Sequence, residues 1–200
     1  MSEPIEFFFD FSSPYGYLAQ CASKRIEDES GRALVFRPYL MGAVFKETGR
    51  APLKNHPLVW DYAQNDVARS ARRSGVPINL PDPFPVITAG ACRAFYYIQN
   101  TEGDTPAREL ARQLYEAYFV DGKNISKSDV VIDIASKGRD SQLIQAGLTD
   151  ESMKLKLREI TAEAISRGIF GSPFFIVDGE PFWGHDRIDE VIDWANSGGW

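Results

Sequence analysis

The sequence predicts an α/β fold in which a βαβ unit near the N-terminus and a ββα unit near the C-terminus enclose a long helical segment. Three observations predict it. The run Ile5–Phe9 is short, apolar and rich in aromatic residues, as expected of a buried strand. Asp178-Gly179 separates two further strand-like runs and is a hairpin signal. Between these ends, apolar residues recur at helical spacing over more than a hundred residues.

The N-terminal unit is predicted from one break and two periodic runs. After the strand Ile5–Phe9, Asp10–Pro14 interrupts the apolar pattern, and a helix is expected over Tyr15–Glu29. Gly31 is a suitable residue to end that helix, because glycine adopts the left-handed conformation found at many helix C-termini. Leu34–Leu40 alternates in polarity and is predicted to be the second strand.

The middle of the chain is predicted to be helical, with an irregular loop near its start. Thr105-Pro106 and Thr149 supply helix start signals, and glycines supply stop signals. The segment Pro77–Pro85 holds four prolines and is expected to be irregular. The expected helices are Pro57–Ser74, Val86–Asn100, Pro106–Val120, Ser128–Lys137 and Glu151–Arg167.

The C-terminal unit is predicted as a hairpin followed by a helix. Phe174–Val177 and Glu180–Trp183 flank the Asp-Gly turn, and a closing helix is expected over Asp186–Asn196. The resulting order is that of the thioredoxin-like fold with a large all-helical insertion. We therefore expect a discontinuous thioredoxin-like domain, residues 1–40 and 169–200, and a helical insertion domain, residues 41–168.

Composition excludes several classes of function. The 44% apolar and 25% charged residues are ordinary values for one globular chain of 200 residues. A net charge of −6 disfavours nucleic acid as a partner, and we interpret Arg69, Arg72 and Arg73 as a solvated helix face unless they contact an anionic ligand. No apolar run reaches the roughly 20 residues of a membrane span. The acidic start Met1–Pro4 lacks a secretory pattern, so a cytoplasmic location is expected.

The two cysteines, Cys21 and Cys92, lie far apart and form neither a Cys-x-x-Cys motif nor a zinc-binding spacing. We expect both to be buried and to act as small hydrophobic residues. Dithiol redox chemistry and a structural metal site are therefore not expected.

The first candidate site lies where the first strand meets the first helix. Pro14 suits the first helical position, which makes Ser13 the expected N-cap, although Ser12 could also take that role. Capping alone is a sufficient explanation for Ser13. A helix N-terminus also stabilises an anion, and thioredoxin-like enzymes use this position to hold a cysteine thiolate. Here Ser13 and Gly16 replace both sulfurs of such a motif, so a hydroxyl could donate instead to the thiolate of a ligand, most simply glutathione.

The second candidate site is Ser172-Pro173, at the start of the third predicted strand. A proline at this point of the fold is characteristically cis, and the backbone of Ser172 would then face the first helix and pair with a bound peptide thiol. An ordinary trans proline before a strand is the alternative.

The third candidate site is Trp183-Gly184-His185-Asp186. Asp186 is a good N-cap for the last helix, and its carboxylate could equally hold the ammonium group of a γ-glutamyl ligand. Histidine side chains titrate near neutral pH, so His185 could act as an acid or base, but a lone surface histidine is more often structural and it is assigned a contact with the ligand only.

Three motifs carry a family resemblance. They are Phe7-Phe8-Phe9-Asp10-Phe11-x-Ser13-Pro14-Tyr15-x-Tyr17-Leu18-Ala19, Gly168-x-Phe170-Gly171-x-Pro173 and Phe182-Trp183-Gly184-x-Asp186-Arg187. Together they resemble the 2-hydroxychromene-2-carboxylate isomerases, which are grouped with the kappa-class glutathione transferases among disulfide-forming thioredoxin folds with a helical insertion. The resemblance extends over nearly the whole chain.

The resemblance implies a glutathione-dependent isomerase of aromatic hydroxy-keto acids that acts as a homodimer. Ser13 matches the serine that holds the glutathione thiolate, and Ser172, before Pro173, matches the residue that contacts the glutathione backbone. Residues 183–186 match the segment that binds the γ-glutamyl end. In the family, the thiolate is thought to add reversibly to a conjugated substrate so that a bond can rotate.

The chain departs from the family pattern at four positions. Arg50 replaces an asparagine, Val59 a lysine, Ser70 a tryptophan and Phe174 a threonine. Two other functions therefore stay open: a kappa-type transferase, which would consume glutathione, and a non-catalytic protein that binds a thiol or peptide.

Overall fold

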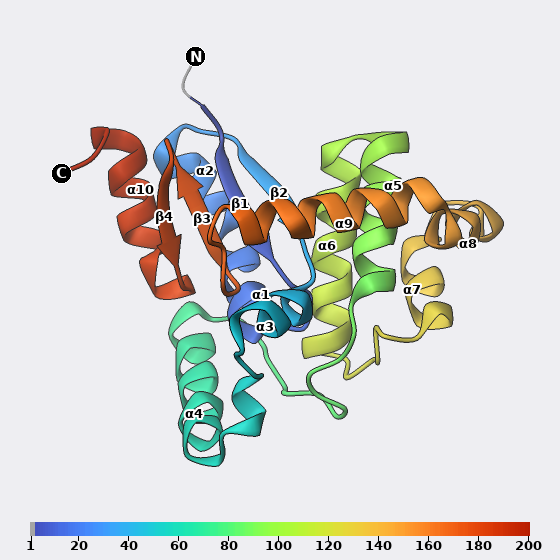
Figure 1. Cartoon of the computed structure of the whole chain (residues 1–200), viewed down its shortest axis with the longest axis horizontal. Coiled ribbons are helices and arrows are strands. Elements are labelled where there is room, and N and C mark those ends of the chain that lie inside the picture. Colours follow the sequence, from blue (N-terminus) through green and yellow to red (C-terminus); the bar gives the residue numbers. More distant parts are fainter. Residues whose placement is uncertain (1–2) are drawn as a thin grey trace.

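The computed structural model describes residues 3–200 and is built on a four-stranded mixed sheet of order β2-β1-β3-β4 (Figure 1). Its strands are β1 (Ile5–Phe9), β2 (Leu34–Pro38), β3 (Phe174–Val177) and β4 (Glu180–Trp183). β1 pairs in parallel with β2 and antiparallel with β3, and β4 pairs antiparallel with β3. The sheet of a thioredoxin-like fold is thereby confirmed, with β1 at its centre.

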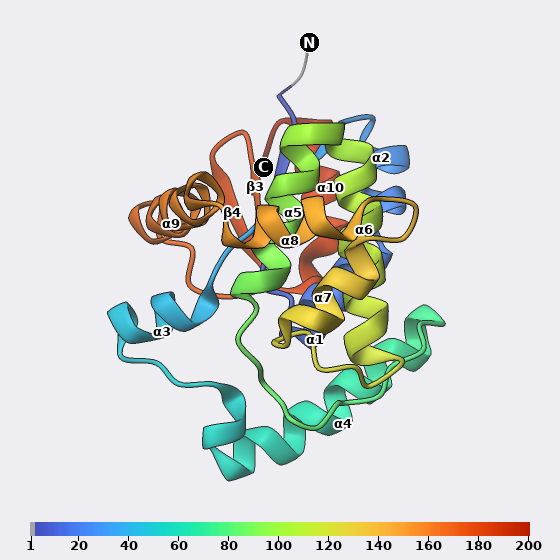
Figure 2. The same ribbon diagram turned by 90° about the vertical axis from the view of Figure 1, so that its right-hand side faces the viewer.

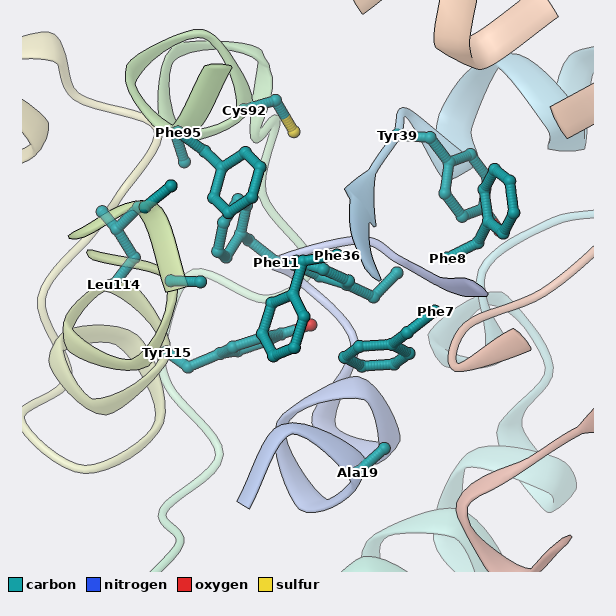
Figure 3. Close-up of a cluster of buried hydrophobic side chains, with 14 of the residues drawn as sticks. Phe7, Phe8, Phe11, Ala19, Phe36, Tyr39, Cys92, Phe95, Leu114 and Tyr115 are labelled. Atoms are coloured by element: carbon teal, nitrogen blue, oxygen red, sulfur yellow. The ribbon is translucent and has the colours of Figure 1, made fainter. Parts of the chain in front are cut away.

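The aromatic run of β1 forms the centre of the core because both faces of this strand are covered (Figure 3). On one face, the Phe7 ring stacks on Phe175 of β3 at 5.0 Å between centroids and meets Phe36 of β2 edge-on. On the other face, Phe8 lies against Tyr39. A strand buried on both faces has no polar alternation, which explains the continuous apolar pattern of Ile5–Phe9.

The predicted single helix Tyr15–Glu29 is wrong, because the structure divides it into α1 (Pro14–Cys21) and α2 (Ser23–Ser30). The break lies at Ala22, whose N–H is shared between the carbonyls of Ala19 and Gln20. Apolar periodicity did not detect it, because the helical pattern continues across Ala22. Gly31 ends α2 with φ 64°, as expected.

Helices cover both faces of the sheet (Figure 1). α9 (Glu151–Ser166) crosses one face, while α2 packs with α10 (Ile188–Ser197) on the other. The hairpin prediction is confirmed, with positive φ at both turn residues, Asp178 and Gly179. The closing helix begins later than predicted, since a 3-10 turn, η2 (His185–Arg187), precedes α10.

All elements between β2 and β3 are helical within the described residues, as predicted. Two of the helices were not predicted: α3, which lacks a side-chain cap at Leu40, and α8, which is capped by the carboxylate of Asp140. The division into two domains stays a prediction. Before α9, the elements are α3 (Met41–Thr48), η1 (Leu53–Asn55), α4 (Pro57–Ser74), α5 (Ala89–Glu102), α6 (Asp104–Phe119), α7 (Ser128–Ala135) and α8 (Ser141–Thr149).

α4 lies along the lower edge of the molecule, away from the sheet (Figure 2). It packs on α1, and its buried residues are the small apolar Ala63, Val67 and Ala71. The Trp60 ring stacks on Phe84 at 5.2 Å between centroids, which ties α4 to the loop that precedes α5. That loop is irregular, as expected from its prolines.

The two cysteines differ in exposure. Cys92 is fully buried, as expected, and burial raises the pKa of its thiol. The prediction that Cys21 is buried is wrong, because it lies at the exposed end of α1, where the helix breaks. Across residues 3–200, no helix is both long and apolar enough to cross a bilayer. The first two residues of the acidic N-terminal segment lie outside the described part of the chain.

A partly buried ion-pair cluster joins β1, β2 and the end of α9. Glu6 pairs with Arg37 at 2.7 Å and with Arg167, and both guanidinium groups lie over the Phe8 ring. The hydrogen bond from Arg167, followed by the charge of Arg37, holds the pKa of Glu6 below its ordinary value. Glu6 therefore contributes to this cluster only while its carboxyl is ionised.

We expect acid to remove this contribution. Because the pKa of Glu6 is lower in the folded than in the unfolded chain, its stabilisation is present above about pH 5 and is lost as the pH falls through the folded value. The variant Glu6→Gln should lose about 1 kcal/mol of unfolding free energy at pH 7 and little at pH 3 in urea titrations. Glu159→Gln, an exposed change on α9, is the control. An equal loss for Glu6→Gln at both pH values would contradict the prediction.

Candidate functional site

Ser13 caps α1 as predicted, and its hydroxyl both accepts and donates a hydrogen bond. Its Oγ accepts from the backbone N–H of Gly16 at 3.0 Å and donates to the backbone carbonyl of Ser172 at 2.9 Å. Pro14 follows at the first helical position, so Ser13 lies at the positive end of the helix dipole. Ser12 does not share the cap, because its hydroxyl donates to Asp10 instead.

The Ser172–Pro173 peptide bond is cis, as predicted. The Ser172 backbone lies against the cap of α1, and its side-chain Oγ accepts from the backbone N–H of Asp10 at 3.0 Å. The absence of a side chain at Gly16 is required here, because a Cβ would lie 2.5 Å from the Tyr115 hydroxyl oxygen and 2.9 Å from Ser172 Oγ. Glycine at position 16 therefore lets the cis-proline loop and α6 approach the start of α1 together.

Asp10 is a buried carboxylate on which the site depends, and no local sequence pattern indicated its role. Oδ1 accepts from the N–H and the hydroxyl of Ser12 and from the hydroxyl of Thr88, the residue before α5. Oδ2 accepts from the backbone N–H of Met41, the first residue of α3. The backbone carbonyl of Asp10 accepts from Ser13 N–H and from the Tyr115 hydroxyl. One residue thus joins the starts of α1, α3 and α5.

The titration of Asp10 reflects two opposed effects. Burial raises the pKa of this carboxyl, and the hydrogen bonds from Ser12, Met41 and Thr88 lower it by a smaller amount. No cationic side chain pairs with Asp10 among the described residues. Its hydrogen-bond donors therefore replace the water that the carboxyl loses on folding.

Trp183 and Gly184 lie beside the cis-proline loop. The indole Nε1 lies so close to Gly171 that a Cβ there would be 2.2 Å away, and the indole packs on the Phe170 ring at 4.9 Å between centroids. Gly184 has φ 121° and donates its N–H to the carbonyl of Pro173 at 3.1 Å. These contacts place the third candidate site, residues 183–186, next to the second, Ser172-Pro173.

His185 and Asp186 occupy η2 rather than the start of the last helix. The His185 ring stacks on Tyr15 of α1 at 5.0 Å between centroids, and burial lowers the pKa of His185 despite the nearby carboxylates. The interpretation of Asp186 as the N-cap of α10 is wrong, because Arg187 occupies that position without a side-chain cap and Asp186 pairs with Arg187.

A contact that sequence reasoning missed connects this part of the site to α4. The Tyr15 hydroxyl donates to the carboxylate of Asp66 at 2.8 Å, and Asp66 also pairs with Arg69. Burial and the Asp66 carboxylate raise the pKa of Tyr15 well above its ordinary value, so Tyr15 stays protonated and keeps this hydrogen bond. Arg69 is exposed, as expected of a solvated helix face, and it also lines the site. The residue spacing alone gave no signal for this pairing.

All seven predicted site residues line one cavity of about 2030 Å³ between the sheet end, α3 and α4. Its opposite wall is apolar and includes Met41, Trp60, Phe84 and Ile87. Of the four departures from the family pattern, Arg50, Val59 and Ser70 also line the cavity, whereas Phe174 is buried in β3. The predicted site residues are Ser13, Ser172, Pro173, Trp183, Gly184, His185 and Asp186.

Comparison with known proteins agrees with this architecture. The family model described as DSBA-like thioredoxin domain matches residues 4–193. The chain belongs to the DSBA-like thioredoxin domain family. The expected family resemblance is thereby confirmed at the level of fold and membership.

The relatives of this chain include proteins named as isomerases and proteins named as glutathione transferases. The chain is 26% identical to a 2-hydroxychromene-2-carboxylate isomerase of Sphingobium xenophagum, over 94% of this chain and 96% of that protein. It is 25% identical to glutathione S-transferase kappa 1 of Rattus norvegicus, over 92% and 87%. A solved 2-hydroxychromene-2-carboxylate isomerase superposes with a TM-score of 0.85 at 22% identity, covering 94% of this chain and 92% of that one.

This family member should lose stability when the Asp10 carboxylate is removed. Asp10→Ala leaves the N–H groups of Ser12 and Met41 and the hydroxyl of Thr88 without their acceptor, and is expected to cost about 3 kcal/mol of unfolding free energy. Asp10→Asn keeps the side-chain volume and one acceptor oxygen, so it should cost about half as much. Chemical unfolding of the three proteins at pH 7 measures both losses. Equal stability of Asp10→Ala and the parent protein would refute the role given to this residue.

Proposed function

We propose that this protein is a glutathione-dependent isomerase of aromatic hydroxy-keto acids of the 2-hydroxychromene-2-carboxylate type. One observation carries the proposal: the position that holds a reactive cysteine in dithiol members of this fold is occupied by Ser13, at the N-terminus of α1 and against Ser172. A hydroxyl there cannot exchange disulfides, but the helix end still stabilises an anion. The sulfur must therefore come from a ligand.

The hydrogen bonds of Ser13 suggest how a thiolate would be accommodated. Ser13 has one hydroxyl proton, which it donates to the carbonyl of Ser172. A thiolate at the start of α1 would take this hydrogen bond, and the Ser172 carbonyl would then need another donor. The amide N–H of a cysteinyl residue could be that donor. A peptide thiol therefore satisfies both groups, whereas a thiol without a neighbouring N–H leaves the Ser172 carbonyl unpaired.

The remaining predicted residues are proposed to hold the rest of glutathione. Pro173 fixes the backbone of Ser172 toward α1, and the γ-glutamyl end would lie against Trp183, Gly184 and His185. The carboxylate of Asp186 would pair with the α-ammonium group. These residues line the same cavity as Ser13, which supports a single extended ligand.

In the proposed reaction, the Ser13-bound thiolate adds to the carbon–carbon double bond conjugated with the keto group of the substrate. A carbon–sulfur bond forms and the electron pair moves to the keto oxygen, which leaves a single bond free to rotate. The pair then returns, the carbon–sulfur bond breaks and the thiolate is released. The apolar wall with Trp60 and Phe84 suits the aromatic part of the substrate.

The deciding experiment is a titration with glutathione. Calorimetry should show saturable binding, and ultraviolet absorbance at pH 7 should show a bound thiolate, because the α1 terminus and Ser13 lower the thiol pKa by about two units. Ser13→Ala should abolish the thiolate signal. Ser12→Ala is the matched control, since it removes the neighbouring hydroxyl, which faces Asp10. If the parent protein does not bind glutathione measurably, or if all three proteins give equal thiolate signals, the proposal is wrong. A non-catalytic peptide-binding role would then be favoured.

A kappa-type transferase is the second candidate, because the relatives include kappa transferases at about the same identity as the isomerases. The two functions differ in the fate of glutathione. An isomerase should convert many equivalents of a hydroxychromene carboxylate for each glutathione present and leave the free thiol unchanged, as measured with a thiol reagent. Loss of one thiol for each molecule of product would assign the transferase instead.

A cytoplasmic homodimer completes the proposal. A reducing compartment keeps glutathione in its thiol form, as the mechanism requires. The homodimer is proposed from the family resemblance.

A further inference from the structure

The Asp10 carboxylate places a buried negative charge in the wall of the proposed ligand cavity. Its Oδ1 accepts from both the N–H and the hydroxyl of Ser12, the residue directly before Ser13. The backbone of Asp10 accepts from Ser13 N–H and donates to Ser172 Oγ. The carboxylate thus belongs to the residue that holds both sides of the proposed thiolate position.

The elements packed around Asp10 supply no charge that neutralises it. At the starts of α1, α3 and α5, the groups that donate to the carboxylate are backbone N–H and hydroxyl groups. The titratable side chains that face it lie after β2 and on α5 and α6, and burial raises the pKa of each, so that all are neutral at pH 7. They are Tyr39, Cys92, Tyr115 and Tyr118.

The hydrogen bonds to Asp10 favour its ionised form. Burial alone raises the pKa of the carboxyl, but four N–H and O–H groups donate to its two oxygens and oppose that effect. Each oxygen accepts from a backbone N–H, that of Ser12 or that of Met41, and a backbone N–H cannot reverse its direction to accept from a protonated carboxyl. These fixed donors favour a carboxylate at neutral pH.

We propose that the Asp10 carboxylate tunes the reactivity of the ligand's sulfur by opposing the anion-stabilising effect of the α1 terminus and Ser13. This inference rests on the proposed function, because it concerns the thiolate bound there. A negative charge disfavours a second one nearby, and the repulsion is strong where water is excluded.

The opposition has a chemical use. A helix N-terminus lowers the pKa of a thiol far below neutrality in some enzymes, and a thiolate of low pKa is a weak nucleophile. The Asp10 charge limits that fall, so the bound thiol titrates near neutral pH, where a large ionised fraction is combined with good nucleophilicity. Asp10 is therefore a positioning residue that acts on the sulfur and does not contact the substrate.

The first test places a thiol in the chain and does not depend on glutathione. In Ser13→Cys, the pKa of the introduced thiol is read from the ultraviolet absorbance of its thiolate across a pH series, with the parent protein as baseline. Adding Asp10→Asn should lower that pKa by about one unit, because a unit charge within about 10 Å acts on this scale at a partly buried site. Thr88→Val in the same background is the control, since it removes one hydrogen bond to the carboxylate and keeps the charge.

Two results of this test would overturn the inference. An unchanged thiol pKa in the double variant would mean that the charge does not reach the site. A higher pKa would mean that Asp10 acts only by holding the start of α1 in place. If the double variant does not fold, the carboxyl-carbon resonance of Asp10 in Ser13→Cys supplies the same measurement. It should shift at the pH at which the introduced thiol ionises and not in the parent protein, and a resonance without that shift would overturn the inference.

The second test concerns the bound ligand. With saturating glutathione, the thiolate absorbance of the parent protein should titrate near neutral pH, and Asp10→Asn should move this titration about one unit lower. Thr88→Val should leave it in place. A role of Asp10 in stability alone would lower the amount of folded protein without moving the pH at which the bound thiol ionises.

The outcomes separate the two proposals. If glutathione binds as a thiolate and its titration is the same in the parent protein and in Asp10→Asn, the inference is wrong, although the proposed function stands. If Asp10→Asn and Thr88→Val move the titration equally, the hydrogen bonds and not the charge are responsible, and the inference is also wrong. If the parent protein does not bind glutathione, the proposed function fails, and the inference fails with it, whatever the introduced thiol shows.

Discussion

The buried carboxylate of Asp10 is the interaction on which the rest of the site depends. A carboxyl group without water must have hydrogen-bond donors, and the donors nearest to it are backbone and hydroxyl groups at the starts of α1, α3 and α5. Meeting that need draws three helix N-termini to the end of β1. The backbone of Asp10 then fixes Ser13 and Ser172 through its carbonyl and its N–H. The geometry of the candidate site is therefore set by a buried carboxylate that is hydrogen-bonded within the fold.

The site keeps the electrostatics of a thiol enzyme without a thiol. The positive end of α1, the cis-proline loop and the close approach permitted by Gly16 are all present, and each would favour an anion beside Ser13. The two cysteines of the chain lie elsewhere, and burial raises the pKa of the Cys92 thiol. An anion-stabilising site without its own nucleophile is suited to a ligand that brings one.

The cavity has two walls of different stability. The wall formed by the sheet end is continuous with the aromatic core, in which Phe7, Phe8 and Phe9 are inaccessible to solvent. The wall formed by α4 is held by three small apolar residues, the Trp60–Phe84 stack and the hydrogen bond from Tyr15 to Asp66. Fewer buried contacts imply a lower free energy of local opening, so α4 is the part of the cavity best able to adjust to a substrate.

The sequence by itself determined the strands, the hairpin and the capping role of Ser13, because these follow from local chemistry: apolar runs, Asp-Gly at a turn, and a serine before a proline. It also named the seven candidate residues, which lie in three contiguous motifs and line one cavity, whereas their roles stay a prediction. Only the tertiary structure decided which distant residues contact those motifs. Asp10 with Thr88, Tyr15 with Asp66 and Arg50 with Phe170 are pairs far apart in the chain, and no local pattern encodes their contact. The break at Ala22 and the 3-10 turn before α10 were likewise decided by packing, since helical periodicity continues through both.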